Sequence, residues 1–273
     1  MTNSAANAGV SGYNAGILKV EKRFKSGGMV SGNYTYSKSL ADVESAAAGG
    51  FGNGAQAVPN TGNFVNYGPQ QYDNLRATEY ALSSFDIRNR FMVSYVLNLP
   101  FGEGQKWAHY NGVAGALVSG WTINGITNFQ NGFPMAFNQQ SNNTLTALGY
   151  GTIRPNKDAG CNPEISGSGK DRLHQWFKTS CYTVAPDLSL GNEPRVDPKV
   201  RTDGIDNWDL SILKSTRIKD AATVQFRTEF FNTFNHPQFA APQNQADDAV
   251  NFGTVIAQMN NPRLIQFSLR INF

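Results

Sequence analysis

The chain ends on the sequence R-L-I-Q-F-S-L-R-I-N-F, residues 263–273, in which apolar and polar side chains alternate. One side of an extended chain would carry the apolar residues Ile265, Phe267, Leu269, Ile271 and Phe273. A slip of one residue in strand pairing would move Arg270 into this apolar layer, so the facing is well specified. The stretch predicts a β-strand with one apolar face.

The same alternation recurs upstream. Strands are predicted at residues 18–24, 34–36, 90–100, 116–130, 208–213 and 224–230. We expect a tight turn at Ser26, Gly27 and Gly28 to join the strands at 18–24 and 34–36. The Asn131–Gly132 step is expected to bend the strand at 116–130 onward to Phe137. With the last strand the total is about seven, so an all-β, antiparallel fold is predicted.

The connections between these strands alternate in length. They fall at residues 25–28, 39–86, 100–115, 138–206, 218–222 and 235–260, and every second one is long. Outer-membrane barrels alternate short periplasmic turns with long extracellular loops, whereas a soluble β-sandwich has no reason to keep this parity. If the last strand ends at the periplasmic side, every long link lies outside the cell. The pattern predicts an up-and-down transmembrane β-barrel segment.

Composition agrees with this prediction. Charged residues make up only 16% of the chain, aromatic residues 12%, and there are 27 glycines, which disfavours a helical enzyme. No run of about 18 apolar residues is present, but a membrane-spanning strand needs only about 9 to 11 residues. Aromatic residues near strand ends would form interfacial girdles or simply reflect strand propensity; they are Tyr34, Tyr36, Tyr95, Trp121, Phe129 and Phe230.

Several functional classes are disfavoured. The net charge of +3 comes from scattered residues without a basic run, so no nucleic-acid partner is expected. His109, His174 and His236 are isolated, and no nucleophile elbow accompanies a serine, so we expect no catalytic site and no enzyme. His236 is expected to shape a turn, because Asn235 and Pro237 both favour turns.

Cofactor and metal sites are not expected either. Gly50, Gly52 and Gly54 lack the Lys-Ser/Thr or G-x-G-x-x-G context of a phosphate loop. Three acidic residues, Asp203, Asp206 and Asp209, could offer oxygens to calcium, but their spacing does not fit an EF-hand, and solvated loop acids are the preferred interpretation.

The two cysteines, Cys161 and Cys181, lie in one polar segment rich in proline and glycine. A local disulfide formed in an oxidising compartment is the favoured interpretation, and two free thiols are the alternative. The disulfide would staple one of the long extracellular loops.

The ending resembles the terminal β-signal that outer-membrane proteins present to their assembly machinery. That signal has a final aromatic residue preceded by apolar residues at every second position, a pattern filled by Ile265, Phe267, Leu269, Ile271 and Phe273. Ser268 departs mildly from the signal, which often has glycine there.

Internal motifs resemble the Oar-like branch of TonB-dependent receptors. They are S-F-D-I-R-N-R-F at 84–91, G-W-T-I-N-G-I at 120–126, N-W-D-L-S-I-L-K-S-T-R-I at 207–218 and V-Q-F-R-T-E-F-F-N-T-F-N-H-P-Q-F at 224–239. The resemblance covers the chain from about Leu18 to Phe273, and the F-F-N-x-F-N-H-P run is its most specific part. In that family these segments close a barrel of roughly 22 strands.

The resemblance implies that residues 1–273 are the C-terminal part of such a barrel. The signal peptide, TonB box and plug domain of the family have no counterpart in this sequence. The implied function is a share in TonB-dependent transport of an unidentified ligand, captured by the long loops, in the bacterial outer membrane. The implied partners are membrane lipid, the barrel assembly machinery, and TonB through the missing N-terminal part.

Three alternatives remain open. The first is a non-transporting surface barrel that acts in adhesion or carbohydrate binding. The others are a soluble β-rich lectin and a barrel enzyme such as an outer-membrane lipase.

Overall fold

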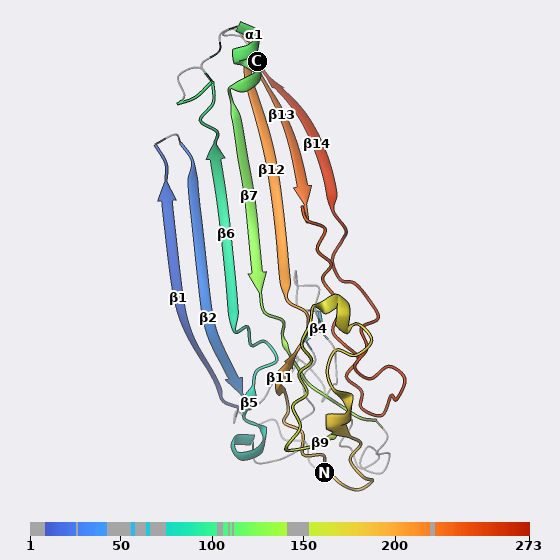
Figure 1. Cartoon of the computed structure of the whole chain (residues 1–273). Coiled ribbons are helices and arrows are strands. Elements are labelled where there is room, and N and C mark those ends of the chain that lie inside the picture. Colours follow the sequence, from blue (N-terminus) through green and yellow to red (C-terminus); the bar gives the residue numbers. More distant parts are fainter. Residues whose placement is uncertain are drawn as a thin grey trace.

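The computed structural model describes residues 9–25, 27–42, 56–57, 64–65, 75–102, 106–108, 110, 112–140, 153–218 and 222–273. A single curved, antiparallel sheet dominates this part of the chain (Figure 1). Its long strands are β1 (Ser11–Arg23), β2 (Met29–Ala41), β6 (Asn89–Asn98), β7 (Trp121–Gln130), β12 (Ile205–Ile218), β13 (Ala222–Phe231) and β14 (Leu264–Asn272). Each contains at least 9 residues, enough to cross a bilayer when tilted.

The strands pair in the order in which they follow one another in sequence. The sheet order is β1-β2-β6-β7-β12-β13-β14, so each long strand lies beside its sequence neighbours. Short β5 (Ala81–Leu82) adds to the edge of β2. Among the described strands, β1 and β14 form the two edges. The predicted all-β, up-and-down arrangement of about seven strands is therefore confirmed.

The alternation of short and long connections is also confirmed. The chain passes from β1 to β2, from β6 to β7 and from β12 to β13 at one end of the sheet, which we call the turn end, where the C-terminus also lies (Figure 1). The long connections follow β2, β7 and β13, whose C-terminal ends lie at the other end of the sheet, the loop end. The first turn is tight as predicted: Phe24 N–H donates to Gly28 O at 2.7 Å, and Gly27 has a φ of 84°, which glycine adopts readily. Ser26 lies outside the described residues.

Strand register gives the sheet one apolar and one polar face. Side chains directly opposite each other lie on the same face, so the apolar row Leu18, Tyr34, Phe91 and Phe129 crosses four strands. The predicted girdle residues all fall on this apolar face. The other face carries mainly polar side chains, including Asn33, Asn124, Asn128, Gln225, Arg227, Glu229, Gln266 and Arg270. Arg227 Nη1 and Glu229 Oε1 lie 3.5 Å apart on it.

The prediction for residues 116–130 was wrong at its start. Residues Gly112–Val118 form the helix α1, and β7 begins only at Trp121. Leu117 therefore does not share a strand face with Trp121. Gly120, with a φ of 74°, ends the helical segment, as glycine often does beyond a helix C-terminus. No described helix is long and apolar enough to cross a membrane.

The extension of this strand to Phe137 was wrong as well. Strand β7 ends at Gln130, and the next short strand, β8 (Pro134–Met135), pairs with β11 (Asp197–Arg201) outside the main sheet. Phe137 is fully buried in a separate core at the loop end. The remaining short elements are β3 (Gln56–Ala57), β4 (Phe64–Val65), the π-helix η1 (Leu75–Glu79), β9 (Asn156–Lys157), the 3-10 helices η3 (Gly169–Arg172) and η4 (Thr179–Cys181), and β10 (Tyr182–Thr183).

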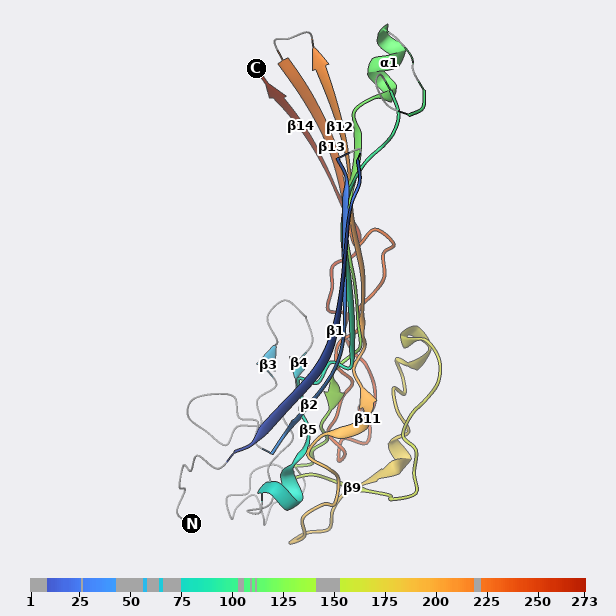
Figure 2. The ribbon, with the colours of Figure 1, turned by 90° about the vertical axis from the view of Figure 1, so that its left-hand side faces the viewer.

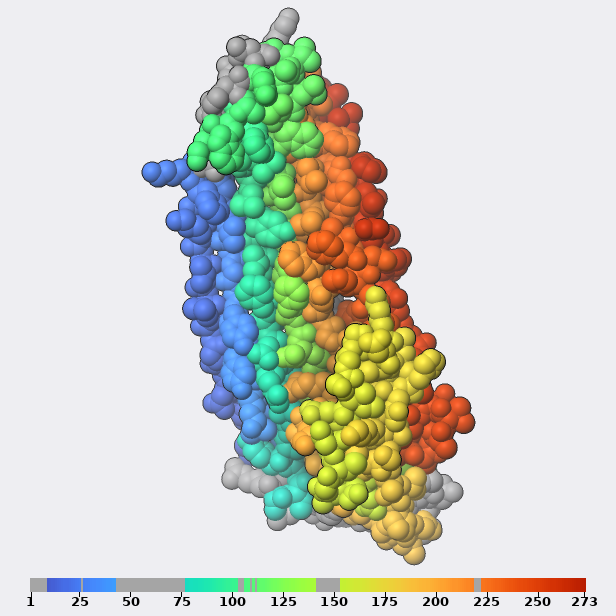
Figure 3. Space-filling model, viewed as in Figure 1, coloured from blue at the N-terminus to red at the C-terminus, as the bar shows by residue number. Residues whose placement is uncertain are grey.

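The loop-end core joins two long connections. Phe137 packs against Phe177 and Tyr182, with ring centroids 4.9 and 4.4 Å away, and Phe252 from the last connection packs against Phe177 at 5.2 Å. These residues, with Met135, Trp176, Cys181 and Val200, form the largest buried cluster among the described residues. These two long connections are therefore packed into one folded unit, which we call the outer-loop unit (residues 131–140, 153–204 and 232–263). Figure 3 shows residues 153–190 of this unit, in yellow, standing in front of the strand ends.

Candidate functional site

A cleft of about 600 Å³ lies where the outer-loop unit meets the loop ends of β7 and β12. A cleft of this volume can hold a small-molecule ligand. The side chains that carry most of its chemistry are Gln130, Asn162, Glu164, Arg172, Lys199 and Asp203. The cleft thus offers amides, carboxylates and cationic groups within one enclosure.

Two glycines allow the backbone to fold tightly beneath the cleft. A Cβ atom on Gly132 would lie 1.9 Å from Thr202 O, and one on Gly204 would lie 2.5 Å from Gln130 O. Phe133 N–H donates to Thr202 Oγ1 at 3.0 Å, and Thr202 N–H returns a bond to Phe133 O at 2.8 Å. This close approach connects the end of β7 to the start of β12 and forms the floor of the cleft.

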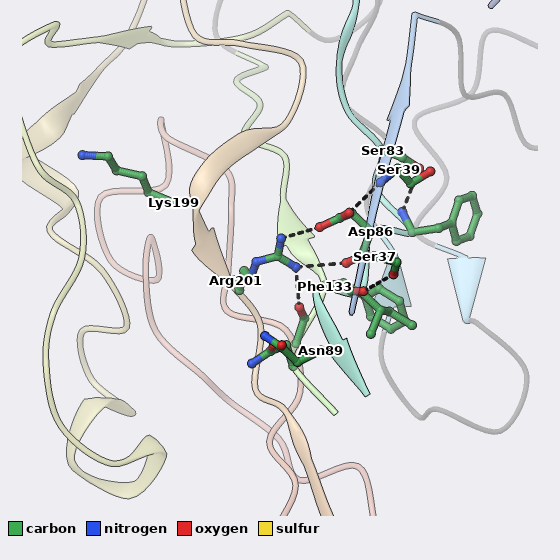
Figure 4. A network of polar contacts seen from close by, with 12 residues as sticks. Ser37, Ser39, Ser83, Asp86, Asn89, Phe133, Lys199 and Arg201 are labelled. Atoms are coloured by element: carbon green, nitrogen blue, oxygen red, sulfur yellow. Dashed lines mark hydrogen bonds and ion pairs between the residues drawn. The ribbon is translucent and has the colours of Figure 1, made fainter. Parts of the chain in front are cut away.

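Arg201 anchors the floor to the sheet. Its Nη2 forms an ion pair with the Asp86 carboxylate, and its Nη1 donates to Asp86 O at 2.9 Å and to Gly132 O at 3.0 Å. The other oxygen of Asp86 accepts Ser39 N–H at 2.8 Å, so this carboxylate links β11 to β2. Figure 4 shows Arg201 pointing toward Asp86, while Lys199 projects from the same strand in another direction. The planar guanidinium suits this fixed, forked geometry.

The side wall of the cleft is built on Trp176. Its ring is 2% exposed, and its Nε1 donates to Arg201 O at 2.7 Å. The guanidinium carbon of Arg172 lies 4.2 Å from the centroid of the ring, a cation–π contact. Trp176 thereby fixes the position of a cationic group that lines the cleft.

The remaining charged groups have different surroundings. Burial raises the pKa of Asp203, although its oxygens accept the backbone N–H groups of Phe239 at 2.9 Å and Gly204 at 3.1 Å. Lys199 Nζ lies 3.4 Å from Asn162 Oδ1. Three cationic side chains line the cleft, Arg172, Lys199 and Arg201. Arg201 is paired with Asp86, and the other two are balanced by Glu164 and Asp203, which favours a polar ligand without a large net charge.

A buried charge cluster supports the strand that carries Lys199 and Arg201. Asp197 accepts Tyr182 Oη–H at 2.6 Å and forms an ion pair with Lys157. Burial opposes ionisation of Asp197, but these two hydrogen bonds and that of Lys199 N–H outweigh it and lower its pKa. Burial, reinforced by the nearby Asp197 charge, raises the pKa of Glu193 to about 9, so Glu193 is protonated at neutral pH.

Cys161 and Cys181 are joined by a disulfide, with their Cα atoms 5.4 Å apart. Cys181 is fully buried in the loop-end core, and Cys161 packs against the same core. The bond closes the segment that contributes Asn162, Glu164 and Arg172 to the cleft. It lies at the loop end of the sheet.

The three aspartates that the sequence singled out do not converge. Asp203 binds backbone N–H groups as described above. Asp206 Oδ2 lies 3.0 Å from His236 Nδ1, and Asp209 accepts Asn232 N–H at 2.9 Å. Within the described ranges no group of three or more His, Cys, Asp or Glu side chains could hold a metal ion. His174 is exposed in the outer-loop unit, and His109 lies outside the described residues.

The F-F-N-x-F-N-H-P run forms the base of the last long connection. Asn232 and Asn235 have φ values of 50° and 54°, a region that asparagine tolerates better than most residues. Asn232 Oδ1 accepts His236 N–H at 2.8 Å, and Asn235 Oδ1 accepts Arg263 N–H at 2.9 Å. The turn that leaves β13 is at Thr233 and Phe234, and His236 follows it, so Asn232 and not His236 holds the turn together.

Sequence reasoning missed the residues that build the cleft. Arg172, Lys199 and Arg201 lie in short elements and Trp176 lies outside any element, so no recognisable spacing joins them, and their convergence depends on long-range packing. One signal was present: Asp86, the partner of Arg201, belongs to the S-F-D-I-R-N-R-F motif.

The C-terminal alternation occupies the edge strand β14. Its apolar face carries four side chains that are each more than half exposed: Ile265, Phe267, Leu269 and Ile271. Phe273 follows the end of the strand and is fully exposed. Exposed apolar side chains in such a continuous band indicate a nonaqueous environment.

Comparison with known proteins identifies the family. A family described as an outer membrane beta barrel domain matches residues 1–266. The chain therefore belongs to the outer-membrane β-barrel family and is located in the bacterial outer membrane. Neither curated proteins nor solved structures gave a match.

Membership of this family assigns the two faces and the two ends of the sheet. The apolar face contacts lipid, and the polar face lines the barrel interior. The turn end is periplasmic and the loop end is extracellular. The cleft is thus at the cell surface, and Gln130, which lines it, lies on the interior face of β7.

Proposed function

We propose that this chain forms part of a TonB-dependent outer-membrane transporter that takes up a polar ligand from the cell surface. The observation that carries the proposal is the position of the cleft. Gln130 belongs both to the cleft lining and to the interior face, where Asn128 and Asn124 add polar groups along β7 on either side of Ile126. A ligand leaving the cleft on this side would meet polar groups suited to its own hydrogen-bonding surface.

The resemblance of the sequence motifs to those of Oar-like receptors supports TonB as the source of energy for uptake. In this proposal TonB acts on a part of the protein outside these 273 residues, and the outer-loop unit captures the ligand. Arg172, held by Trp176, and Lys199 would provide donors, while Glu164 and Asn162 would provide acceptors.

Depletion of compounds from the growth medium tests the proposal even though the ligand is unidentified. Mass spectrometry of spent medium would be compared among cells with the intact gene, cells lacking it, and cells lacking TonB. We expect at least one polar compound to disappear only when both the gene and TonB are present. Depletion that persists without TonB, or no depletion that depends on the gene, would refute energised uptake.

Cleft variants connect that uptake to the structure. Arg172→Ala and Lys199→Ala should slow depletion several-fold, because each removes a donor from the cleft. Lys170→Ala is the matched control, since Lys170 is an exposed cation in the same segment that does not line the cleft. Equal effects of all three substitutions would argue against capture in this cleft.

The mixture of amides, carboxylates and a guanidinium also suits hydroxyl-rich ligands, which favours one alternative, a non-transporting barrel that binds carbohydrate. That protein would retain surface binding of glycans in cells without TonB, and it would deplete nothing from the medium.

A further inference from the structure

The helix α1 has an unusual position in the periplasmic connection between β6 and β7. Figures 1 and 2 show it at the height of the periplasmic ends of β12 and β13, standing to one side of the sheet. Two residues that contact α1 identify that side. They are Lys214 of β12 and Trp121 of β7, which lie opposite each other on the lipid-facing surface of the sheet.

Both side chains hold the C-terminal end of α1. Lys214 Nζ donates to Ala116 O at 2.6 Å and to Ser119 O, and Trp121 Nε1 donates to Leu117 O at 2.9 Å. These bonds satisfy carbonyl groups that a helix end leaves without intrahelical partners. Since both donors come from the lipid-facing surface, α1 lies on the lipid side of the barrel wall.

The helix presents an apolar ridge away from its own connection. Gly115 marks the inner side, because a Cβ atom there would lie 2.1 Å from Tyr110 O. Val113 and Leu117 are four residues apart and project from the opposite side, with 80% and 65% of their surfaces exposed. Nearby Trp107 and Tyr110 are 52% and 57% exposed.

Composition around the ridge is that of a membrane interface. Trp and Tyr favour the boundary between headgroups and acyl chains, and lysine can keep its ammonium group at that boundary while its stem lies against apolar surface. Lys106 Nζ lies 5.0 Å from the centroid of the Trp107 ring, so a cationic group accompanies these aromatics. An anionic phosphate is its natural counter-charge.

We propose that α1, together with Trp107 and Tyr110, is embedded in the periplasmic leaflet of the outer membrane. Val113 and Leu117 lie among the acyl chains, and Lys106 lies at the level of the phosphates. The occupant of this surface is phospholipid, because the ridge continues the lipid-facing surface of the sheet and lies at its periplasmic edge. The segment anchors the barrel wall as an interfacial helix does.

Spin labels test this placement directly. The sequence contains two cysteines, joined to each other in the structure, so a substituted cysteine can be labelled specifically. The full protein carrying Val113→Cys or Leu117→Cys would be labelled with a nitroxide in phosphatidylethanolamine–phosphatidylglycerol bilayers. Collision rates with oxygen, which concentrates in lipid, would be compared with those of a water-soluble nickel complex.

Val250→Cys is the matched control, because Val250 is 84% exposed in the outer-loop unit at the extracellular end. Labels at 113 and 117 should show an oxygen-to-nickel collision ratio several-fold above the label at 250. Ratios equal to that of the control would place the ridge in water and overturn the proposal. Labels immobilised and shielded from both reagents would place it against protein and would also overturn it.

Folding of each variant is checked by the heat-dependent shift of barrels in gel electrophoresis, and two independent label sites ensure that one misfolded variant does not decide the result. The inference depends on the outer-membrane location and not on TonB-dependent uptake. Loss of energised depletion would therefore leave it unaffected.

Discussion

Arg154 and Glu79 form an ion pair in the interior of the loop end, with Arg154 Nη2 2.9 Å from Glu79 Oε1 and side chains only 1% and 0% exposed. The two residues are 75 positions apart and come from different long connections. Arg195 adds a second link, because its Nε donates to Glu79 O at 3.2 Å and its Nη2 to Ala41 O at 2.6 Å. The buried cations thus attach the outer-loop unit to the ends of β2 and η1.

Breaking the Arg154–Glu79 pair should loosen the outer-loop unit. Removing one partner of a buried pair leaves an uncompensated charge and typically costs about 3–5 kcal/mol. Arg154→Met or Glu79→Leu alone should therefore speed cleavage of the extracellular loops by proteinase K on intact cells. The double variant should regain much of the protection, because neither charge remains. A double variant as sensitive as the worse single variant would contradict this account.

The pH dependence of the outer-loop unit should reflect Glu193. Its pKa is raised to about 9 in the folded unit from an ordinary value of 4.5, so the folded state holds a proton that the unfolded state loses. The contribution of Glu193 to the free energy of unfolding is complete below its pKa in the unfolded state. It is lost as the pH rises toward its pKa in the folded state, by up to about 1.4 kcal/mol per pH unit. Asp197 has a lowered pKa and acts in the opposite direction, at acidic pH.

Loop protection against proteinase K should therefore fall as the pH rises from about 4.5 to about 9. Glu193→Gln keeps the shape of the side chain without an ionisable group, so it should flatten this dependence. An unchanged slope in that variant would assign the pH dependence to another group.

The long strands were predictable from sequence because each has one lipid-facing and one interior face, and this produces a period of two. Helix α1 was not, because its apolar Val113 and Leu117 face outward, and residues 116–120 continue the apolar pattern of β7. Between the end of α1 and the start of β7, the change from helix to strand is marked only by Gly120, which has a positive φ.

The cleft was beyond sequence reasoning for a different reason. Arg201 and Asp86 are 115 positions apart, and neither sits in a periodic segment. Their contact accompanies the packing of Leu82 in the first long connection against Ala136 and Val196 in the second, a cluster that no local pattern reveals. By contrast, the asparagines of F-F-N-x-F-N-H-P stood out as a motif, because each occupies a backbone conformation that few residues tolerate.

The disulfide should form in cells and should stabilise the cleft wall. A bond that closes a segment of this length typically contributes about 3 kcal/mol. A maleimide reagent should label the denatured protein only after reduction. Cys161→Ser combined with Cys181→Ser should raise proteinase K cleavage within residues 161–181. Labelling of the unreduced protein would instead indicate free thiols, the alternative that the sequence left open.

Arginine substitutions should distinguish the faces of β14. Phe267 lies on the apolar face opposite Thr228, with its ring centroid 6.3 Å from that of Phe226. Phe267→Arg puts a charge into lipid and should cost about 2–4 kcal/mol near the bilayer midplane. Gln266→Arg is the matched control, because Gln266 lies on the interior face opposite Glu229, where a cation finds a partner. Urea unfolding in lipid vesicles measures both, and equal losses would contradict the assigned register.

The terminal residue should act in assembly and contribute little to stability. Phe273 extends beyond the end of β14 and is fully exposed among the described residues, so its removal leaves no cavity in the folded chain. If the assembly machinery reads the final aromatic side chain, Phe273→Ala should reduce the amount of protein in the outer membrane several-fold. Phe273→Tyr should restore it, because the aromatic ring is retained.

The urea midpoint of the Phe273→Ala protein that does reach the membrane should match that of the unchanged protein. Asn272→Ala is the control at the adjacent position, where the side chain accepts a bond from Arg270 Nε at 3.0 Å. If Asn272→Ala reduced membrane levels as much as Phe273→Ala, or if Phe273→Ala lowered the midpoint instead, the loss would come from strand stability and not from recognition of the terminal ring.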